Sequence, residues 1–205
     1  MAIGAGIRER RRADTTAALI AAARRRVIAG GLSGFTIEDL CVDVDISRRT
    51  FFNYFATKEN AVVGIPVRFG DQELVEAFIA AGERSGEVSP ALIDDFAELV
   101  IARWEKLNFT ASDIADLREA FAREPRLLDY LAEIGTAGEK ADARSIEIRE
   151  GLAEGDLRAT VAVEIVTGLK LSASRQLFAG DTTDDLRTLV LNRVRVARGL
   201  FAAEV

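Results

Sequence analysis

The stretch FTIEDLCVDVDISRRTFFNYFATKENAV, residues 35–62, has the most informative structural pattern in this 205-residue chain. Thr36 is a good helix N-cap, and Asp39 stands three residues further on, as in a capping box. That helix is expected to end near Asp45, and Ser47 is expected to cap the next one. Two short helices separated by a turn of about four residues form a helix-turn-helix. Asp45 falls in the turn, where a residue that tolerates positive φ is favoured.

The second helix of this motif carries more large residues than a core can use. Phe51 and Phe55 are four residues apart and can pack against the preceding helix, so the remaining side chains point outward. In a major groove Arg can bind guanine, Asn can pair with adenine, and Thr or Phe can contact the thymine methyl group. Hydroxyl side chains and a lysine at a helix N-terminus suit phosphate oxygens. The predicted DNA contacts are therefore Thr36, Ser47, Arg48, Arg49, Thr50, Phe52, Asn53, Tyr54 and Lys58.

The charge of the chain is divided unevenly along its length. The net charge of −6 by itself disfavours a polyanionic partner. Residues 1–60, however, have ten Lys and Arg against seven Asp and Glu, whereas residues 61–205 have seventeen against twenty-six. A basic front and an acidic rear indicate two tasks in one chain. We expect a flexible basic arm over residues 1–12, a helix-turn-helix domain over 13–60 and a second domain over 61–205.

The composition favours an all-α protein, because only three prolines occur and good helix formers dominate. The first helix is expected from Asp14 to about Ala29, where Gly30 and Gly31 end it. Thr57 is expected to cap a short helix after the helix-turn-helix. Apolar spacing of 3.6 residues predicts further helices over about 92–107, from a cap at Ser112 to Pro125, over about 127–152 with interruptions at Gly135 and Gly138, and over about 159–179 and 183–203.

Several sequence features concern partners and location. The segment 159–179 is apolar on nearly all sides, which indicates that its own core covers one side and a partner chain the other. No apolar run approaches the roughly 18 residues of a membrane span. The start, MAIGAGIRERRRAD, lacks the apolar stretch of a secretory signal. The single Cys41 excludes an internal disulfide, and we expect a cytoplasmic protein.

Signs of catalysis are scarce in the sequence. It has no histidine and a single cysteine, and no carboxylate pair stands out for acid–base work. Asp181, Asp184 and Asp185 resemble a metal cluster only superficially, because a loop followed by carboxylates at a helix start explains them better. We therefore predict no catalytic residue, no metal site and no cofactor. An all-α enzyme that works through carboxylates alone is kept as an alternative.

The run from Gly31 to Val62 resembles the DNA-binding domain of the tetracycline-repressor (TetR) family of bacterial regulators. The matching residues are Phe35–Thr36, Ile37-Glu38-Asp39-Leu40, Ile46–Ser47, Thr50-Phe51-Phe52, Tyr54–Phe55 and Lys58–Glu59. The run covers 32 of the 205 residues, about a sixth of the chain. Asp45 stands where the family usually has glycine, and Arg49 where a small residue is common. The second departure should shift base preference toward guanine.

The resemblance implies a homodimer with about nine helices per chain, in which the last two helices form the dimer interface. It implies a repressor that a small, mostly apolar ligand releases from a near-palindromic operator of double-stranded DNA. The fourth helix would couple the DNA-binding helices to the C-terminal ligand-binding domain. Candidate ligand contacts are Phe96, Val100, Trp104, Phe121, Tyr130 and Leu171, with Arg103 and Arg175 as anchors for an anion. The same residues also suit a core or surface ion pairs.

A second alternative is a helical dimerisation protein whose helix-turn-helix no longer binds DNA. This alternative predicts that Arg48 and Arg49 can be replaced by alanine without effect. The outward set of Arg48, Arg49 and Asn53 argues against it, because a purely structural helix has no use for these residues in this arrangement.

Overall fold

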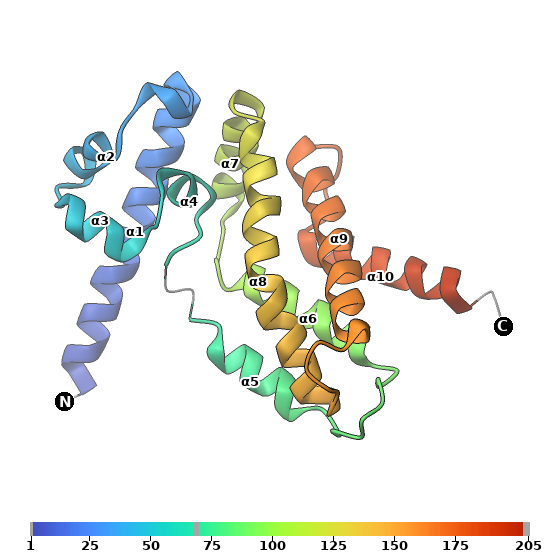
Figure 1. Cartoon of the computed structure of the whole chain (residues 1–205). Coiled ribbons are helices and arrows are strands. Elements are labelled where there is room, and N and C mark those ends of the chain that lie inside the picture. Colours follow the sequence, from blue (N-terminus) through green and yellow to red (C-terminus); the bar gives the residue numbers. More distant parts are fainter. Residues whose placement is uncertain (1, 68–69, 203–205) are drawn as a thin grey trace. The chain divides into compact units, whose positions relative to one another are not determined.

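The computed structural model describes residues 2–67 and 70–202, which form ten α-helices and one short 3-10 helix (Figure 1). No strand occurs within these two ranges, which confirms the predicted all-α class. The helices are α1 (Ala2–Gly30), η1 (Leu32–Gly34), α2 (Ile37–Val44), α3 (Arg48–Tyr54), α4 (Lys58–Val63), α5 (Gln72–Ala80), α6 (Leu92–Glu105), α7 (Ala111–Arg123), α8 (Arg126–Glu150), α9 (Leu157–Ala179) and α10 (Leu186–Ala202).

The chain forms two compact units that are discontinuous in sequence. The first unit comprises Met1–Phe69 and Phe109–Tyr130, and the second comprises Gly70–Asn108 and Leu131–Val205. The sequence predicted a division near residue 60, but α4 and α7 both pack against α1 in the first unit. The functional division into DNA-binding and ligand-binding parts stays a prediction.

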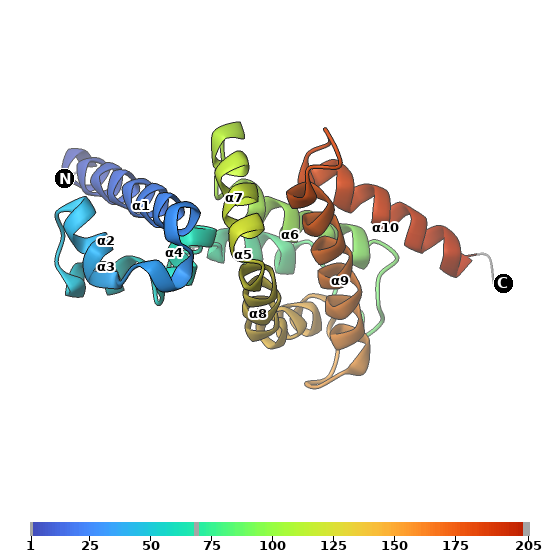
Figure 2. The same ribbon diagram turned by 90° about the horizontal axis from the view of Figure 1, so that it is seen from above.

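Helix α1 is the scaffold of the first unit. It packs against α2, α4 and α7, and Figure 2 shows α2 and α3 along one flank of it. Leu19, Ala22 and Ala23 of α1 are completely buried, as are Phe51 of α3 and Phe55, which follows the end of α3. Because these aromatic rings fill the space under α3, the opposite face of α3 is left for solvent or for a ligand.

The start of α1 corrects the sequence prediction. The helix begins at Ala2 rather than Asp14, so the backbone of the segment expected as a flexible arm is helical. Between residues 7 and 29 there is no glycine or proline, and Ala and Arg are among the best helix formers. A helix anchored by tertiary packing at its C-terminal half can therefore propagate toward the N-terminus. Gly31, at φ 72°, follows its end as predicted.

The second unit is a helical layer built on α6. Helices α5, α9 and α10 all contact α6, and α9 also packs along α10. The core includes Phe96 and Ile101 of α6, Val166 of α9 and Val190 of α10, all of which are completely buried. The apolar stripe expected over residues 92–107 is thus the face of α6 that meets three other helices.

Several predicted helix ends need correction. Thr110, not Ser112, caps α7, because Asp113 completes a capping box with Thr110. Helix α8 runs without interruption through Gly138, since a helical glycine costs only about 1 kcal/mol. Helix α10 begins at Leu186 instead of residue 183. Its predicted end at residue 203 lies outside the described residues.

Candidate nucleic-acid interface

The first helix of the helix-turn-helix begins with a complete capping box. The Thr36 hydroxyl accepts a hydrogen bond from the backbone N–H of Asp39 at 3.2 Å, and the Asp39 carboxylate accepts one from the backbone N–H of Thr36 at 2.7 Å. Hydrogen bonds from the Thr36 backbone and side chain lower the pKa of Asp39. Helix α2 ends at Asp45, whose φ and ψ of 53° are left-handed. The predicted cap and the predicted positive φ are both confirmed.

The second helix, α3, is oriented by one capping residue and two buried rings. The Ser47 hydroxyl accepts from the backbone N–H of Thr50 at 3.1 Å and lies 2.8 Å from the Thr50 hydroxyl. Phe51 and Phe55 are fully buried, with ring centres 6.2 Å apart. The cap fixes where α3 begins, and the rings fix which face it turns to the core.

The outward face of α3 carries the residues predicted to contact DNA bases. Arg48, Arg49 and Asn53 are exposed, and Phe52 is 41% exposed. The other two predicted contacts on this helix, Thr50 and Tyr54, are half-buried. A helix that presents two guanidinium groups and one carboxamide on its free side has the donors and acceptors that base edges recognise.

The two arginines at the start of α3 differ in their surroundings. Arg48 forms an ion pair with Glu38 of α2, and its guanidinium carbon lies 5.6 Å from the centre of the Phe52 ring. Arg49 makes no hydrogen bond or ion pair with any described residue. Arg48 must therefore leave Glu38 to bind a base, whereas Arg49 needs no such exchange.

The surroundings of Lys58 differ from those expected for the predicted phosphate contact. Its ammonium group donates to the carbonyl oxygens of Leu32 and Phe35, and it lies 4.9 Å from the Phe35 ring centre. The start of α4 folds back onto the loop before α2, so the lysine closes that loop. Two of its three donors are already used within the protein.

A buried arginine that was not predicted from the sequence joins three helices of the first unit. Arg24 of α1 is 1% exposed, its Nε donates to the carbonyl oxygen of Val62 at 3.0 Å, and its Nη1 donates to the Asp113 carboxylate at 2.8 Å. Its guanidinium carbon lies 4.9 Å from the centre of the Phe109 ring. Burial lowers the pKa of Arg24, although Asp113 opposes that shift. A signal existed, because Arg24 lies four residues after Ile20, on the apolar face of α1.

The residues that follow α7 make two more polar contacts within the first unit, one with η1 and one with the start of α4. The Glu124 carboxylate accepts from the backbone N–H of Leu32 at 3.3 Å. The Tyr130 hydroxyl donates to the side-chain oxygen of Asn60 at 2.6 Å and lies 2.9 Å from the Thr57 hydroxyl. Tyr130, predicted to contact a ligand, is thus hydrogen-bonded to the start of α4.

The predicted ligand contacts are divided between the two units. Phe121 and Tyr130 belong to the first unit, and Phe121 is buried there. In the second unit Arg103 forms ion pairs with Asp71 at 2.7 Å and with Asp142 at 2.9 Å. Burial lowers the pKa of Arg103, but these carboxylates outweigh it and raise the pKa overall. The remaining residues are Phe96, which is buried, Val100, Trp104 and Leu171, which are half-buried, and Arg175, which is exposed.

Among the hollows lined by described residues, two open on the second unit and neither is lined by a predicted ligand contact. One, of about 630 Å³, lies between α8 and α9 and is lined by charged residues that include Glu147 and Arg144. The other, of about 440 Å³, is apolar and lies between α6 and α9, with Leu92 and Val161 in its wall. The ligand contacts therefore stay a prediction.

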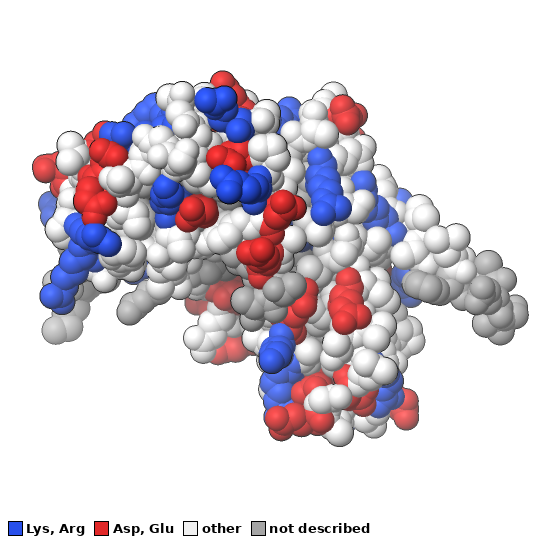
Figure 3. Space-filling model, turned by 45° about the horizontal axis from the view of Figure 1, so that its top comes forward, with Lys and Arg blue, Asp and Glu red and all other residues white. Residues whose placement is uncertain are grey.

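Charge on the surface is mixed. On the face drawn in Figure 3, Lys and Arg alternate with Asp and Glu, so no continuous basic surface is seen in that view.

Within residues 2–67 and 70–202, no group of three or more His, Cys, Asp or Glu residues is placed to hold a metal ion. None of the described helices is long and apolar enough to cross a membrane.

Sequence comparison with a known family agrees with the helix-turn-helix geometry. Residues 19–61 match the sequence profile of the bacterial regulatory proteins of the tetR family. The chain is 28% identical over 187 residues to the HTH-type transcriptional regulator TcmR of Streptomyces glaucescens, covering 88% of this chain and 80% of that protein. A crystal structure assigned to the TetR family, from Mesorhizobium loti, covers 94% of this chain and 98% of its own at 17% identity and a TM-score of 0.42.

The capped helix pair, with its arginine-bearing outer face, defines a helix-turn-helix DNA-binding protein. The profile match spans this motif from α1 to α4, and the relative TcmR matches along most of the chain. Residues 19–61 therefore form a DNA-binding domain of the tetR-family type, and the chain is similar along most of its length to an HTH-type transcriptional regulator.

Proposed function

We propose that the protein is a repressor that binds a near-palindromic operator as a homodimer and leaves it when a small, mostly apolar ligand binds. The observation that carries the DNA-binding part is the outward set of Arg48, Arg49 and Asn53 on α3. Two such helices in a dimer would enter successive major grooves about 34–36 Å apart.

Exposed apolar residues support a dimer through the last two helices. Leu157 and Val161 of α9 are 72% and 39% exposed, and Val196 and Leu200 of α10 are 63% and 69% exposed. Apolar residues on adjacent helices, at spacings of about one turn, form a surface that a second copy of the same helices can cover.

The contacts of α7 support a route by which a ligand could release DNA. The chain leaves the second unit at residue 108 and returns to it at residue 131, so the segment between them belongs to the DNA-binding unit. Arg24 links this segment to α1, and Tyr130 links it to α4. A ligand that prefers one position of this segment would shift the population of the DNA-binding arrangement.

The first experiment is the selection of binding sites from a random duplex library with the full-length protein. The selected duplex is then titrated by fluorescence anisotropy at two salt concentrations with wild type, Arg49→Ala and Arg84→Gln. We expect a palindromic winner and a loss of about 1–3 kcal/mol of base discrimination in Arg49→Ala. Arg84, on the loop after α5 in the second unit, serves as a charge-matched control and should behave as wild type.

Two results would overturn the proposal. Binding without any preferred sequence, governed only by salt, would leave a general DNA-binding protein. No binding to any duplex, with or without added small molecules, would favour the dimerisation protein whose helix-turn-helix no longer binds DNA.

A further inference from the structure

The N-terminal turns of α1 lie outside the segment that defines the family. The profile match begins at residue 19, whereas α1 begins at Ala2. These turns carry three consecutive arginines, of which Arg10 and Arg11 are exposed and Arg12 is half-buried. None of the three forms an ion pair with any described residue. Their charge is therefore available to a partner.

The face of α1 that packs on its own unit continues into two of these arginines. Successive residues of an α-helix are turned by about 100°. Arg12 therefore lies within about 20° of Leu19 around the helix axis, and Arg11 within about 20° of Ala22. Leu19 and Ala22 are completely buried. The stripe through Arg12 is thus apolar where it is buried and basic further toward the N-terminus, and Arg11 lies at its edge, because Ala18, seven residues after Arg11, is exposed.

Arg10 lies on a different face of the same helix. It is turned by about 200° from Arg12 and shares its side with Asp14 and Ala17, four and seven residues further on. Both of those residues are exposed. Arg10 is therefore a control that has the same charge and nearly the same position in the chain, but another direction.

A contact with α3 places the basic part of the stripe beside the predicted DNA surface. The guanidinium carbon of Arg12 lies 5.7 Å from the centre of the Tyr54 ring, and Tyr54 is the last residue of α3. Figure 1 shows the N-terminal half of α1 running past α3, within the same unit. A duplex whose major groove holds α3 would bring its backbone phosphates close to this end of α3.

We propose that Arg11 and Arg12 form a second DNA contact, in which they bind backbone phosphates that flank the bases contacted by α3. The proposal rests on the proposed function, because it requires a duplex seated on α3. Arginine suits this task because its planar fork binds phosphate with two donors at once. Such contacts position the protein and add affinity, but they carry no direct sequence information.

The test is the salt dependence of operator binding by full-length variants, measured by anisotropy on the duplex obtained from the site selection. Each phosphate contact adds about 0.9 to the slope of log K against log salt. Because a dimer loses each contact twice, Arg11→Gln/Arg12→Gln should lower the slope by about 3–4. Affinity at moderate salt should fall at least about tenfold, with unchanged preference among operator variants. Arg10→Gln should leave slope and affinity at the wild-type values.

A further variant separates a phosphate contact from a packing contact with Tyr54. Arg12→Lys keeps the charge but loses the planar group that lies against the ring. It should retain the wild-type slope, and thermal unfolding should show that every variant is folded. Equal slopes for Arg11→Gln/Arg12→Gln and Arg10→Gln would overturn the inference. Failure of the wild type to bind any operator would instead overturn the proposed function.

Discussion

Two buried arginines, one in each unit, occupy similar environments and differ in how completely they are bonded. Arg24 in the first unit is 1% exposed and Arg149 in the second is 3% exposed. Each guanidinium lies against a phenylalanine ring, at 4.9 Å from Phe109 and 4.7 Å from Phe78. All three nitrogens of Arg149 have partners, whereas Nη2 of Arg24 has none within the described part of the chain.

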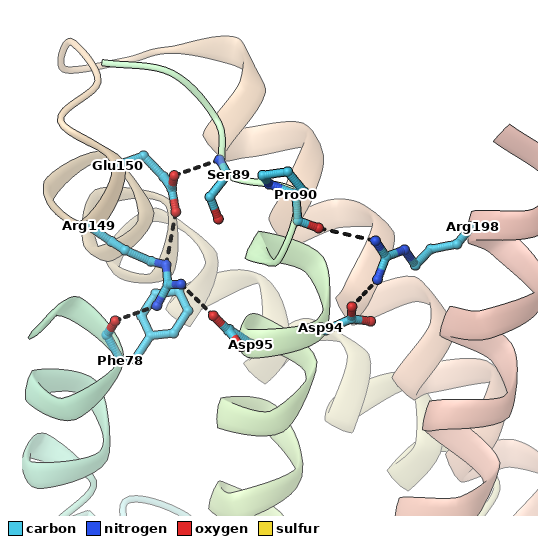
Figure 4. Close-up of polar contacts among 8 residues, drawn as sticks. All are labelled: Phe78, Ser89, Pro90, Asp94, Asp95, Arg149, Glu150 and Arg198. Carbon is cyan, nitrogen blue, oxygen red and sulfur yellow. Dashed lines mark hydrogen bonds and ion pairs between the residues drawn. The ribbon is translucent and has the colours of Figure 1, made fainter. Parts of the chain in front are cut away.

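The bonds of Arg149 fasten the end of α8 to two other elements (Figure 4). Its Nε donates to Glu150 at 2.9 Å, its Nη1 to the carbonyl oxygen of Phe78 at 2.7 Å, and its Nη2 to Asp95. Glu150, itself only 2% exposed, accepts from the backbone N–H of Ser89 at 2.7 Å. The arginine and its carboxylate therefore hold the loop before α6 in one arrangement.

The acid partners also differ, and this difference matters most for stability. Asp113, the partner of Arg24, has a side chain that is 35% exposed and also accepts hydrogen bonds from Thr110. Glu150 has no comparable access to water. Removing one member of a buried pair costs most when the other member is left without water or a donor. Burial of the arginine alone therefore does not determine how much its removal destabilises the protein.

The largest effect is expected for Arg149→Met, which leaves the buried Glu150 without its cation. We expect a loss of about 3–5 kcal/mol in the free energy of unfolding, measured by urea titration with circular dichroism. Adding Glu150→Leu to this variant should restore part of the loss, because the uncompensated charge is then absent. A loss below about 1 kcal/mol would contradict the importance given to this network.

A smaller loss in the free energy of unfolding is expected for Arg24→Met. Asp113 keeps its access to water and its bonds to Thr110, and Nη2 of Arg24 is already without a partner. The expected loss is about 1–3 kcal/mol, for the orphaned Val62 carbonyl and the broken ion pair. The same urea titration measures it. A loss of unfolding free energy equal to that of Arg149→Met would contradict the difference inferred between the two arginines.

The packing around Arg24 can be tested through Gly64, which lies at φ 82°. A Cβ added there would come 2.8 Å from the ring of Phe109, the ring that covers Arg24. We expect Gly64→Ala to lower the unfolding free energy by about 1–3 kcal/mol, through backbone strain and displacement of the ring. Gly155→Ala is the matched control, because Gly155 has φ 79° and open space around its Cα. Equal losses of unfolding free energy in the two variants would show that the Phe109 ring moves aside without an energetic cost.

The smallest effect on stability is expected for the surface pair of Asp156 and Arg158, in which Arg158 is exposed and Asp156 is half-buried. Hydrogen bonds from the Arg158 side chain and backbone lower the pKa of Asp156 to about 2. Because this pKa lies below the ordinary 3.8, the carboxylate adds stability above about pH 4 and loses it as the pH falls toward 2. Asp156→Asn should therefore show a weaker fall in stability between pH 4 and 2, in urea titrations at each pH. An unchanged pH dependence would mean that the pair does not stabilise α9.

Local features of the DNA-binding helices could be predicted from sequence. The caps at Thr36, Ser47 and Thr57 and the left-handed Asp45 depend on hydrogen bonds within three or four residues, so local sequence is enough to specify them. The same rules failed at the cap of α7, because Thr110 and Ser112 are equally good capping residues and only packing selects between them. The predicted start of α1 was too late, because the N-terminal arginines were interpreted as a solvated arm although arginine also favours helix.

The three arginines in a row at 24–26 show the division between sequence and tertiary structure. Local sequence is enough to predict that they lie on a helix and point in three directions about 100° apart. Only tertiary structure decided their surroundings: Arg24 is buried against α4 and α7, Arg25 is exposed, and Arg26 pairs with Asp43 at 2.6 Å. The physical reason is that helix geometry is local, whereas the partners Val62 and Asp113 come from far along the chain.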